Sequence, residues 1–150
     1  MSDSFPAFLA WKGDTTEGNY GRGAELSKPE GRASIPVSSI PLFGGDAGSW
    51  NPEDLIAGAL STCHMLTFLA IANKARVVVT AYQDKAETTL ETVDRISRVG
   101  EIALRPVIHV AAGSDPAKVE ELFIKAHKYC VIANSITAKV IMEPTVVVAS

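Results

Sequence analysis

The sequence predicts one α+β domain spanning residues 1–150, and three observations support that prediction. Short stretches of alternating apolar and polar residues, typical of β-strands, occur near both ends of the chain and in its middle. A long uncharged apolar run follows helix-capping residues at 51–54. A second helical pattern follows Asp115. Strands on both sides of two helices, with no repeat or linker between them, fit a single domain whose helices pack on sheets.

The N-terminal third is expected to form short strands. Residues 5–11 and 19–27 are the first two, separated by the turn-rich segment KGDTTEG, and residues 31–37 are the third. In the second strand, side chains two residues apart share one face. That face holds Tyr20, Arg22, Ala24 and Leu26. Arg22 therefore points the same way as an aromatic ring and a leucine. The glycine-rich stretch 38–49 is a predicted loop.

A long central helix is expected next. Asn51 is a good N-cap, Pro52 suits the first helical position, and the acidic Glu53 and Asp54 complement the positive end of the helix dipole. The helix should continue to about residue 74 or 75. Apolar residues occupy nearly every face of it, and a helix that is apolar all round needs to be buried all round. One small domain can hardly enclose it, so we expect a second subunit to cover part of it.

Strands and a second helix follow. Residues 77 to about 91 and 95 to about 110 have strand-like patterns, and residues 139–148 form the expected final strand. In the 95–110 strand, one face is apolar, with Ile96, Ile102, Leu104, Ile108 and Val110. The second helix begins with Asp115 as its N-cap and carries an apolar stripe at helical spacing. That stripe consists of Val119, Leu122, Phe123, Ala126 and Cys130. Cys130 thus lies at the helix end, in line with the core face.

Charge and composition disfavour several partners. The net charge is −3 and the basic residues are scattered, which argues against nucleic acid or an anionic membrane as the partner. Residues 55–72 reach the lower limit for a membrane span, but the polar residues at the centre of that run and its capped start favour a helix outside the membrane. The N-terminus has no basic segment of a secretory signal. With two cysteines, we expect reduced thiols in the cytoplasm.

Cys63 and Cys130 are the candidate reactive residues. Each lies on an apolar helix surface, where a free cysteine is commonly an inert buried side chain. A reactive cysteine needs a group that favours the thiolate, and Arg22 is the candidate, as an inward-facing cation. The sequence does not say how far apart the two cysteines lie. Both the inert and the reactive interpretation therefore remain open at this point.

The histidines offer two alternatives. A zinc-like set of two sulfur and two nitrogen ligands is present in Cys63, His64, His127 and Cys130. Adjacent helix residues point about 100° apart, so Cys63 and His64 can hardly bind one metal, whereas His127 and Cys130 could. A Cys–His hydrolase needs a histidine opposite the thiol, and His64 cannot reach back to it. We expect His64 and His127 to be packing or hydrogen-bonding groups rather than catalysts, and His109 to lie on a solvated strand face.

Two motifs resemble the OsmC/Ohr family, the osmotically induced and organic hydroperoxide resistance proteins. They are N-P-E-D-L-I-A-G-A-L-S-T-C-H at 51–64 and A-H-K-Y-C-V-I-A-N-S-I at 126–136. The resemblance extends from G-N-Y-G-R at 18–22 to the final strand. It implies an OsmC-like α+β homodimer, in which two intertwined subunits surround two long central helices packed against antiparallel β-sheets. That assembly would supply the burial that the apolar helix requires.

The resemblance also implies roles for four residues. Cys63 corresponds to the peroxidatic thiol and Cys130 to the resolving thiol. Arg22 corresponds to the arginine that stabilises the thiolate and steers the hydroperoxide, and Glu53 to the glutamate that pairs with this arginine. No cofactor or metal is implied. An external dithiol, lipoyl-linked in the best-known members, would reduce the enzyme.

The expected function is therefore that of a cytoplasmic thiol-dependent peroxidase that acts on organic hydroperoxides as a homodimer. Apolar walls around the thiol would favour an alkyl hydroperoxide over hydrogen peroxide, because they can bury the alkyl chain. The alternative is a non-catalytic OsmC-like dimer that binds a small apolar or electrophilic ligand. A structural zinc protein is a third possibility.

Overall fold

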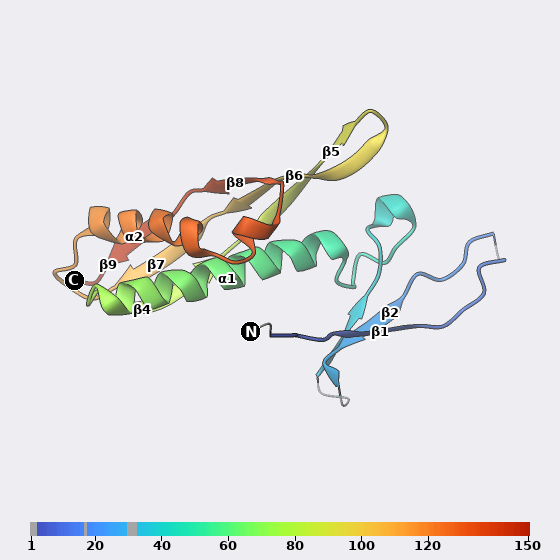
Figure 1. The fold of residues 1–150 in the computed structure, drawn as a ribbon, viewed down its shortest axis with the longest axis horizontal. Helices are drawn as coiled ribbons and strands as arrows, with labels where there is room; N and C mark the ends of the chain where they lie inside the picture. The colour runs from blue at the N-terminus through green and yellow to red at the C-terminus, as the bar shows by residue number, and fades with distance from the viewer. Residues whose placement is uncertain (1–2, 17, 30–32) are drawn as a thin grey trace. The chain divides into compact units, whose positions relative to one another are not determined.

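The computed structural model describes residues 3–16, 18–29 and 33–150. The chain divides into two compact units, Met1–Leu55 and Ile56–Ser150. Helix α1 (Pro52–Lys74) begins in the first unit and continues into the second. The α+β class is confirmed, since both helices and strands are present as expected (Figure 1). The extent of a single domain over residues 1–150 stays a prediction.

The N-terminal unit contains a three-stranded antiparallel sheet in the order β1-β2-β3. Its strands are β1 (Phe8–Trp11), β2 (Ala24–Ser27) and β3 (Ser34–Val37). The three predicted strands are confirmed but shorter, and the predicted start of the third, at residues 31–32, lies outside the described residues. Tyr20 and Arg22 precede β2 and are therefore not part of a strand. Both are nevertheless half-buried and alternate with exposed glycines, as expected if they share one face with Ala24 and Leu26. A short 3₁₀ helix, η2 (Pro41–Phe43), interrupts the predicted loop.

Helix α1 has the predicted start and end. Asn51 Oδ1 accepts a hydrogen bond from the Asp54 backbone N–H at 2.8 Å, and Asp54 Oδ2 accepts one from the Asn51 N–H at 3.4 Å, so the two residues cap the helix reciprocally. Only one stripe of α1 is buried, comprising Ala57, Leu60, His64, Phe68 and Ala72. The predicted burial on every face is therefore not reached within one chain.

By length and composition alone, α1 could cross a membrane, because an 18-residue window of it has a mean hydropathy of 1.8. Of that window, 28% is buried within the chain. A helix at the core of a globular protein meets the same description, so this property does not by itself indicate a membrane span.

The C-terminal unit contains two three-stranded sheets, β4-β7-β9 and β5-β6-β8. Their strands are β4 (Val79–Asp84), β5 (Glu87–Val93), β6 (Ile96–Leu104), β7 (Pro106–Val110), β8 (Lys139–Met142) and β9 (Thr145–Val148). Each of the three long strands predicted from the sequence is thus divided into two. The expectation of antiparallel sheets also needs correction, since β6–β8 and β7–β9 are parallel pairs.

The long strands divide for a local reason. Pro106 and Pro144 lie beside two of the three breaks and lack the N–H that would continue a ladder of hydrogen bonds. The Arg105 backbone N–H donates instead to Asp84 Oδ1 at 2.8 Å. Asp84 Oδ2 accepts a further hydrogen bond from the Ser61 hydroxyl of α1 at 2.5 Å. Asp84 thereby fixes the point where the strands pass from one sheet to the other and ties that point to α1.

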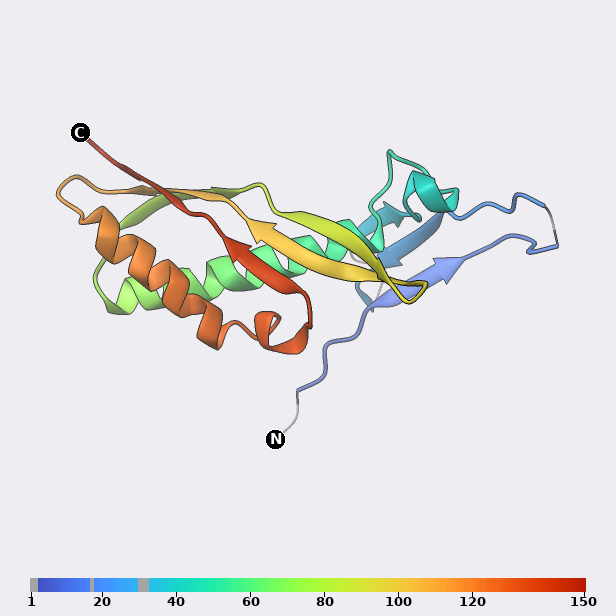
Figure 2. The ribbon, with the colours of Figure 1, turned by 90° about the horizontal axis from the view of Figure 1, so that it is seen from above.

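Helix α2 (Pro116–Tyr129) lies with the C-terminal part of α1 on one side of the strands (Figure 2). Asp115 caps it as predicted, accepting a hydrogen bond from the Ala117 N–H at 3.0 Å. The whole predicted apolar stripe is buried, comprising Val119, Leu122, Phe123, Ala126 and Cys130. The apolar face predicted for the 95–110 strand is also buried apart from Ile96, which is 69% exposed beside the β5–β6 turn.

Candidate active site

The fold brings Cys63 and Cys130 together. Cys63 lies on α1, half-buried, while Cys130 is the C-cap residue of α2 and is fully buried. The two side chains interact directly, and each changes the acidity of the other. Both are free thiols. Their separation along the chain gave no sign of this proximity, which arises because α1 and α2 pack against each other through their buried stripes.

Backbone N–H groups of the turn after α2 face the two sulfurs. The Ala133 N–H donates to Cys130 Sγ at 3.4 Å. The N–H groups of Ile132 and Val131 lie close enough to the Cys63 sulfur to lower its pKa. Successive N–H groups that converge in a turn provide a concavity suited to negative charge. Sequence reasoning missed these donors, because a backbone N–H has no signature in residue type.

These donors give the Cys63 and Cys130 thiols different acidities. Burial acts to raise the pKa of Cys63, but the Ile132 N–H, the Cys130 side chain and the Val131 N–H, with a smaller contribution from the neighbouring Thr67 side chain, together outweigh it, and the pKa lies below its ordinary value. Burial raises the pKa of Cys130, and the neighbouring Cys63 raises it further. The site therefore pairs a more acidic, half-buried thiol with a less acidic, buried one.

His64 is a core residue. Its ring is fully buried and packs on Phe123, with 4.4 Å between ring centroids, and His127 lies 6.3 Å away. Burial and the neighbouring His127 lower the pKa of His64 to about 4, so the ring is neutral near pH 7. Neither ring nitrogen has a hydrogen-bond partner among the described residues. The expectation that His64 packs in the core is confirmed, whereas His109, expected on a solvated face, is half-buried on β7.

The described residues provide no set of ligands for the structural zinc that the sequence left open. In residues 3–16, 18–29 and 33–150, no group of three or more histidine, cysteine, aspartate or glutamate side chains is arranged to hold a metal ion. His127 and Cys130 have the sequence spacing that would allow two side chains of one helix to bind the same metal ion, but they have different neighbours. The His127 Nδ1 is buried without a partner within the described chain, and Cys130 interacts with Cys63.

Arg22 and Glu53 both belong to the N-terminal unit. The Arg22 guanidinium lies 4.3 Å from the centroid of the Tyr20 ring and donates to the Tyr20 carbonyl at 2.8 Å. It also donates to Asn19 Oδ1 at 3.3 Å. Glu53 Oε2 is buried, and the described part of the chain offers it no hydrogen bond. Arg22 and Glu53 form no ion pair with each other among the described residues of this single chain.

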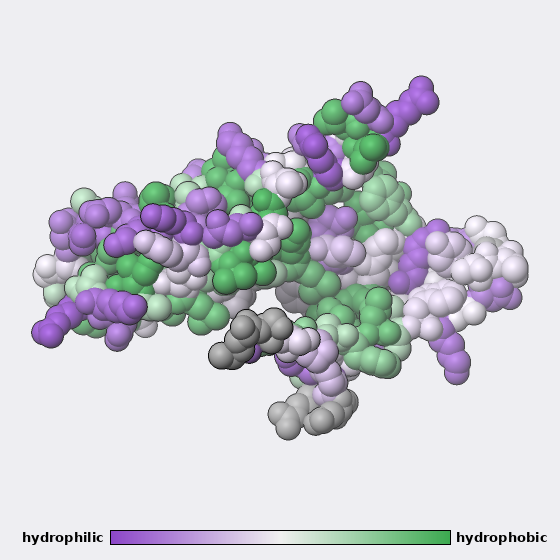
Figure 3. Space-filling view, in the orientation of Figure 1, coloured by the Kyte–Doolittle hydropathy of each residue, from purple (hydrophilic) through white to green (hydrophobic). Residues whose placement is uncertain are grey.

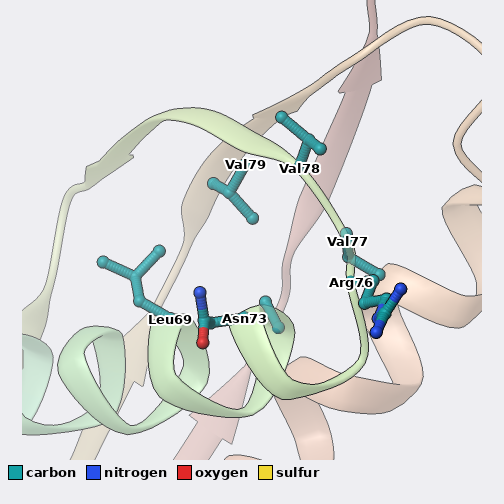
Figure 4. A pocket seen from close by; sticks show the side chains of 7 residues that line it. Leu69, Asn73, Arg76, Val77, Val78 and Val79 are labelled. Atoms are coloured by element: carbon teal, nitrogen blue, oxygen red, sulfur yellow. The ribbon is translucent and has the colours of Figure 1, made fainter.

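Two cavities lie beside the helices of the C-terminal unit. One of about 590 Å³ lies between α1 and α2, with Ile71 and Leu122 among its apolar lining residues and Lys74, Lys118 and Lys125 among its polar ones. Its lining includes Thr67, whose hydroxyl donates to the Cys63 carbonyl at 2.8 Å. A second cavity, of about 430 Å³, lies where α1 ends and β4 begins, with Asn73 and Arg76 opposite valines of the β4 segment (Figure 4). Neither cavity is lined by a cysteine.

Comparison with known proteins gives consistent matches. The sequence model of the OsmC-like protein family matches residues 44–144. Peroxiredoxin OsmC from Escherichia coli strain K12 is 24% identical over 133 residues, which cover 89% of this chain and 90% of that protein. A solved structure of an OsmC-like protein of unknown function from Vibrio cholerae has 30% identity and a TM-score of 0.83, covering 95% of this chain and 99% of that one. The organic hydroperoxide resistance protein OsmC from Legionella pneumophila shares the fold at 22% identity, with a TM-score of 0.70 and coverage of 97% and 98%.

Proposed function

This chain belongs to the OsmC-like protein family, and from that premise we propose that it is a cysteine-based peroxidase that reduces organic hydroperoxides. The single observation that carries the proposal is the direct interaction between Cys63 and Cys130, with opposite effects on their acidity. An acidic thiol beside a protonated one is the arrangement that a peroxidatic and a resolving cysteine need.

The proposed reaction has three steps. The Cys63 thiolate attacks the outer oxygen of the hydroperoxide, the O–O bond breaks, and the leaving alkoxide takes a proton to become an alcohol. Cys63 is then a sulfenic acid. The Cys130 sulfur attacks it, water leaves, and a disulfide forms. An external dithiol reduces this disulfide by thiol–disulfide exchange and becomes oxidised itself. No metal or bound cofactor takes part in this sequence.

The surroundings of Cys63 support an organic rather than an inorganic peroxide as substrate. Cys63 packs against the hydrophobic core, with Ile132 and Ala133 in the same apolar cluster. An alkyl group placed against such surfaces gains about 25 cal/mol for each Å² removed from water, a gain that hydrogen peroxide cannot make. Two free thiols also fit a reducing compartment, so we propose a cytoplasmic location.

We include Arg22 and Glu53 in the proposal because of the family resemblance. The arginine would steer the hydroperoxide and favour the thiolate, and the glutamate would orient the arginine. The buried, unpartnered Oε2 of Glu53 is compatible with a cationic partner, since a buried carboxylate oxygen without a hydrogen bond is costly. We also propose that the active form is a homodimer.

Intact-mass measurement after exposure to cumene hydroperoxide tests the proposal. The wild-type chain should lose two hydrogens, about 2 Da, as the disulfide forms. Cys130→Ser should gain one oxygen and consume one equivalent of hydroperoxide, because the sulfenic acid at Cys63 has no resolving thiol. Cys63→Ser should neither change in mass nor consume hydroperoxide. A wild-type chain whose mass stays unchanged would contradict the peroxidase and leave the ligand-binding dimer as the better interpretation.

A further inference from the structure

The turn that follows α2, residues 130–135, has three successive peptide planes that are each fixed by a residue at 134 or 135. The Cys130 carbonyl accepts hydrogen bonds from Asn134 Nδ2 at 2.9 Å and from the Asn134 N–H at 3.1 Å. The Val131 carbonyl accepts from the Ser135 hydroxyl at 2.8 Å. The Ile132 carbonyl accepts from the Ser135 N–H at 2.9 Å. Asn134 Nδ2 also donates to the Lys128 carbonyl at 3.0 Å, at the end of α2.

A planar peptide unit joins each of these carbonyls to the next N–H, which points the opposite way. Fixing the Cys130 carbonyl therefore fixes the direction of the Val131 N–H, and fixing the Val131 carbonyl fixes that of the Ile132 N–H. These are the two N–H groups that act to lower the pKa of Cys63. The third plane directs the Ala133 N–H to Cys130 Sγ. The side chains at 134 and 135 thus help to fix the first two planes, which carry the Val131 and Ile132 N–H groups, and the Ser135 backbone N–H fixes the third.

We propose that Asn134 and Ser135 are positioning residues that hold the turn so that its N–H groups stabilise the Cys63 thiolate. This inference rests on the proposed function for its biological meaning, but the arrangement itself concerns only the acidity of Cys63. Without the side-chain hydrogen bonds, the carbonyls at the end of α2 would turn toward water, since the last carbonyls of a helix have no partner within it. The N–H groups would then lose their common direction and the thiolate would lose its donors.

The pH dependence of Cys63 alkylation by iodoacetamide, located by peptide mass mapping, tests the proposal. In Ser135→Ala, the midpoint of this dependence should rise by about one pH unit, so that the rate at a pH well below both midpoints falls about tenfold while the high-pH plateau stays within about twofold. Asn134→Ala should shift the midpoint in the same direction. Ser135→Thr keeps a hydroxyl and should restore the wild-type midpoint.

Thr137→Ala is the matched control, because Thr137 is an exposed hydroxyl residue of the same segment with no side-chain hydrogen bond in the described chain. It should keep the wild-type midpoint. If Asn134→Ala does not fold, Ser135→Ala carries the test, since it removes one exposed hydroxyl. A purely structural role would lower the melting temperature and leave the midpoint unchanged, and that result would overturn the proposal. A shifted midpoint in a protein that consumes no hydroperoxide would instead refute the proposed function alone.

Discussion

At the scale of single residues, Cys63 and Cys130 influence each other in opposite directions. The Cys130 side chain lowers the pKa of Cys63, and Cys63 raises the pKa of Cys130. Cys130 therefore keeps its proton while Cys63 carries a negative charge. Once Cys63 is a neutral sulfenic acid, that repulsion disappears and Cys130 can ionise more readily. The order of the two proposed oxidation steps would follow from this electrostatic coupling.

This coupling predicts reciprocal shifts in two variants. Cys130→Ala should raise the pKa of Cys63, because one of the groups that stabilise the thiolate is lost. Cys63→Ala should lower the pKa of Cys130, because the charge that opposes its ionisation is removed. A lower pKa moves the rise in thiolate fraction to lower pH, so ultraviolet thiolate absorbance followed across a pH titration measures both shifts. Unchanged or same-direction shifts would show that the two thiols titrate independently.

At the scale of elements, the sequence predicted the buried face of a helix correctly where the spacing of its apolar residues alone determines that face. The stripe of α2 is buried throughout, because helical spacing alone aligns its residues on one face. The long strands were predicted without their breaks, although Pro106 and Pro144 mark two of them in the sequence. The contact that fixes the crossing point, between the Asp84 carboxylate and the Arg105 N–H, joins residues far apart along the chain and has no sequence signal. Motifs identified both cysteines, but not the turn donors. The adjacent Asn134 and Ser135, both residues that favour side-chain-to-backbone bonds, were the available signal.

The packing of α1 against α2 predicts a pH-dependent stability through His64. The pKa of this buried ring is lowered from 6.5 to about 4, so the unfolded chain binds a proton between these values that the folded chain does not. Above about pH 6.5, His64 is neutral in both the folded and the unfolded chain and does not lower the free energy of unfolding. As the pH falls toward 4, protonation of His64 in the unfolded chain lowers this free energy by about 3 kcal/mol in total.

Urea unfolding of the wild type and of His64→Leu at a series of pH values measures this effect. Carboxylates titrate in the same range in both proteins, so the difference between the two stability curves isolates His64. Wild type should lose more stability than His64→Leu as the pH falls from about 6.5 to 4. Parallel curves would mean that His64 does not titrate in this range on unfolding. Leucine suits the site because the two ring nitrogens have no hydrogen-bond partner among the described residues.

At the scale of the whole molecule, the main unexplained feature is the uncovered side of α1. Along the middle of the helix, five exposed residues form a stripe at helical spacing, comprising Ala59, Thr62, Leu66, Ala70 and Asn73. In the space-filling view, hydrophobic surface extends along α1 beside the hydrophilic outer side of α2 (Figure 3). Small side chains around a single leucine allow another helix to approach closely. The sequence predicted that a second subunit covers this helix, and the homodimer stays a prediction.

Leu66→Glu tests the homodimer, because Leu66 is 57% exposed at the centre of this stripe. In a symmetric dimer, the same surface of both subunits would meet there, so each dimer would bury two carboxylates without partners. We expect the dissociation constant of the dimer to rise about a hundredfold, which corresponds to a loss of about 3 kcal/mol of association free energy, because an unpaired buried charge is costly. Analytical ultracentrifugation at several concentrations measures the change. Ile124→Glu, which places the same charge at a 46% exposed position of α2, is the matched control and should stay dimeric. A wild-type protein that sediments as a monomer, or a Leu66→Glu variant as dimeric as the control, would remove α1 from any subunit interface.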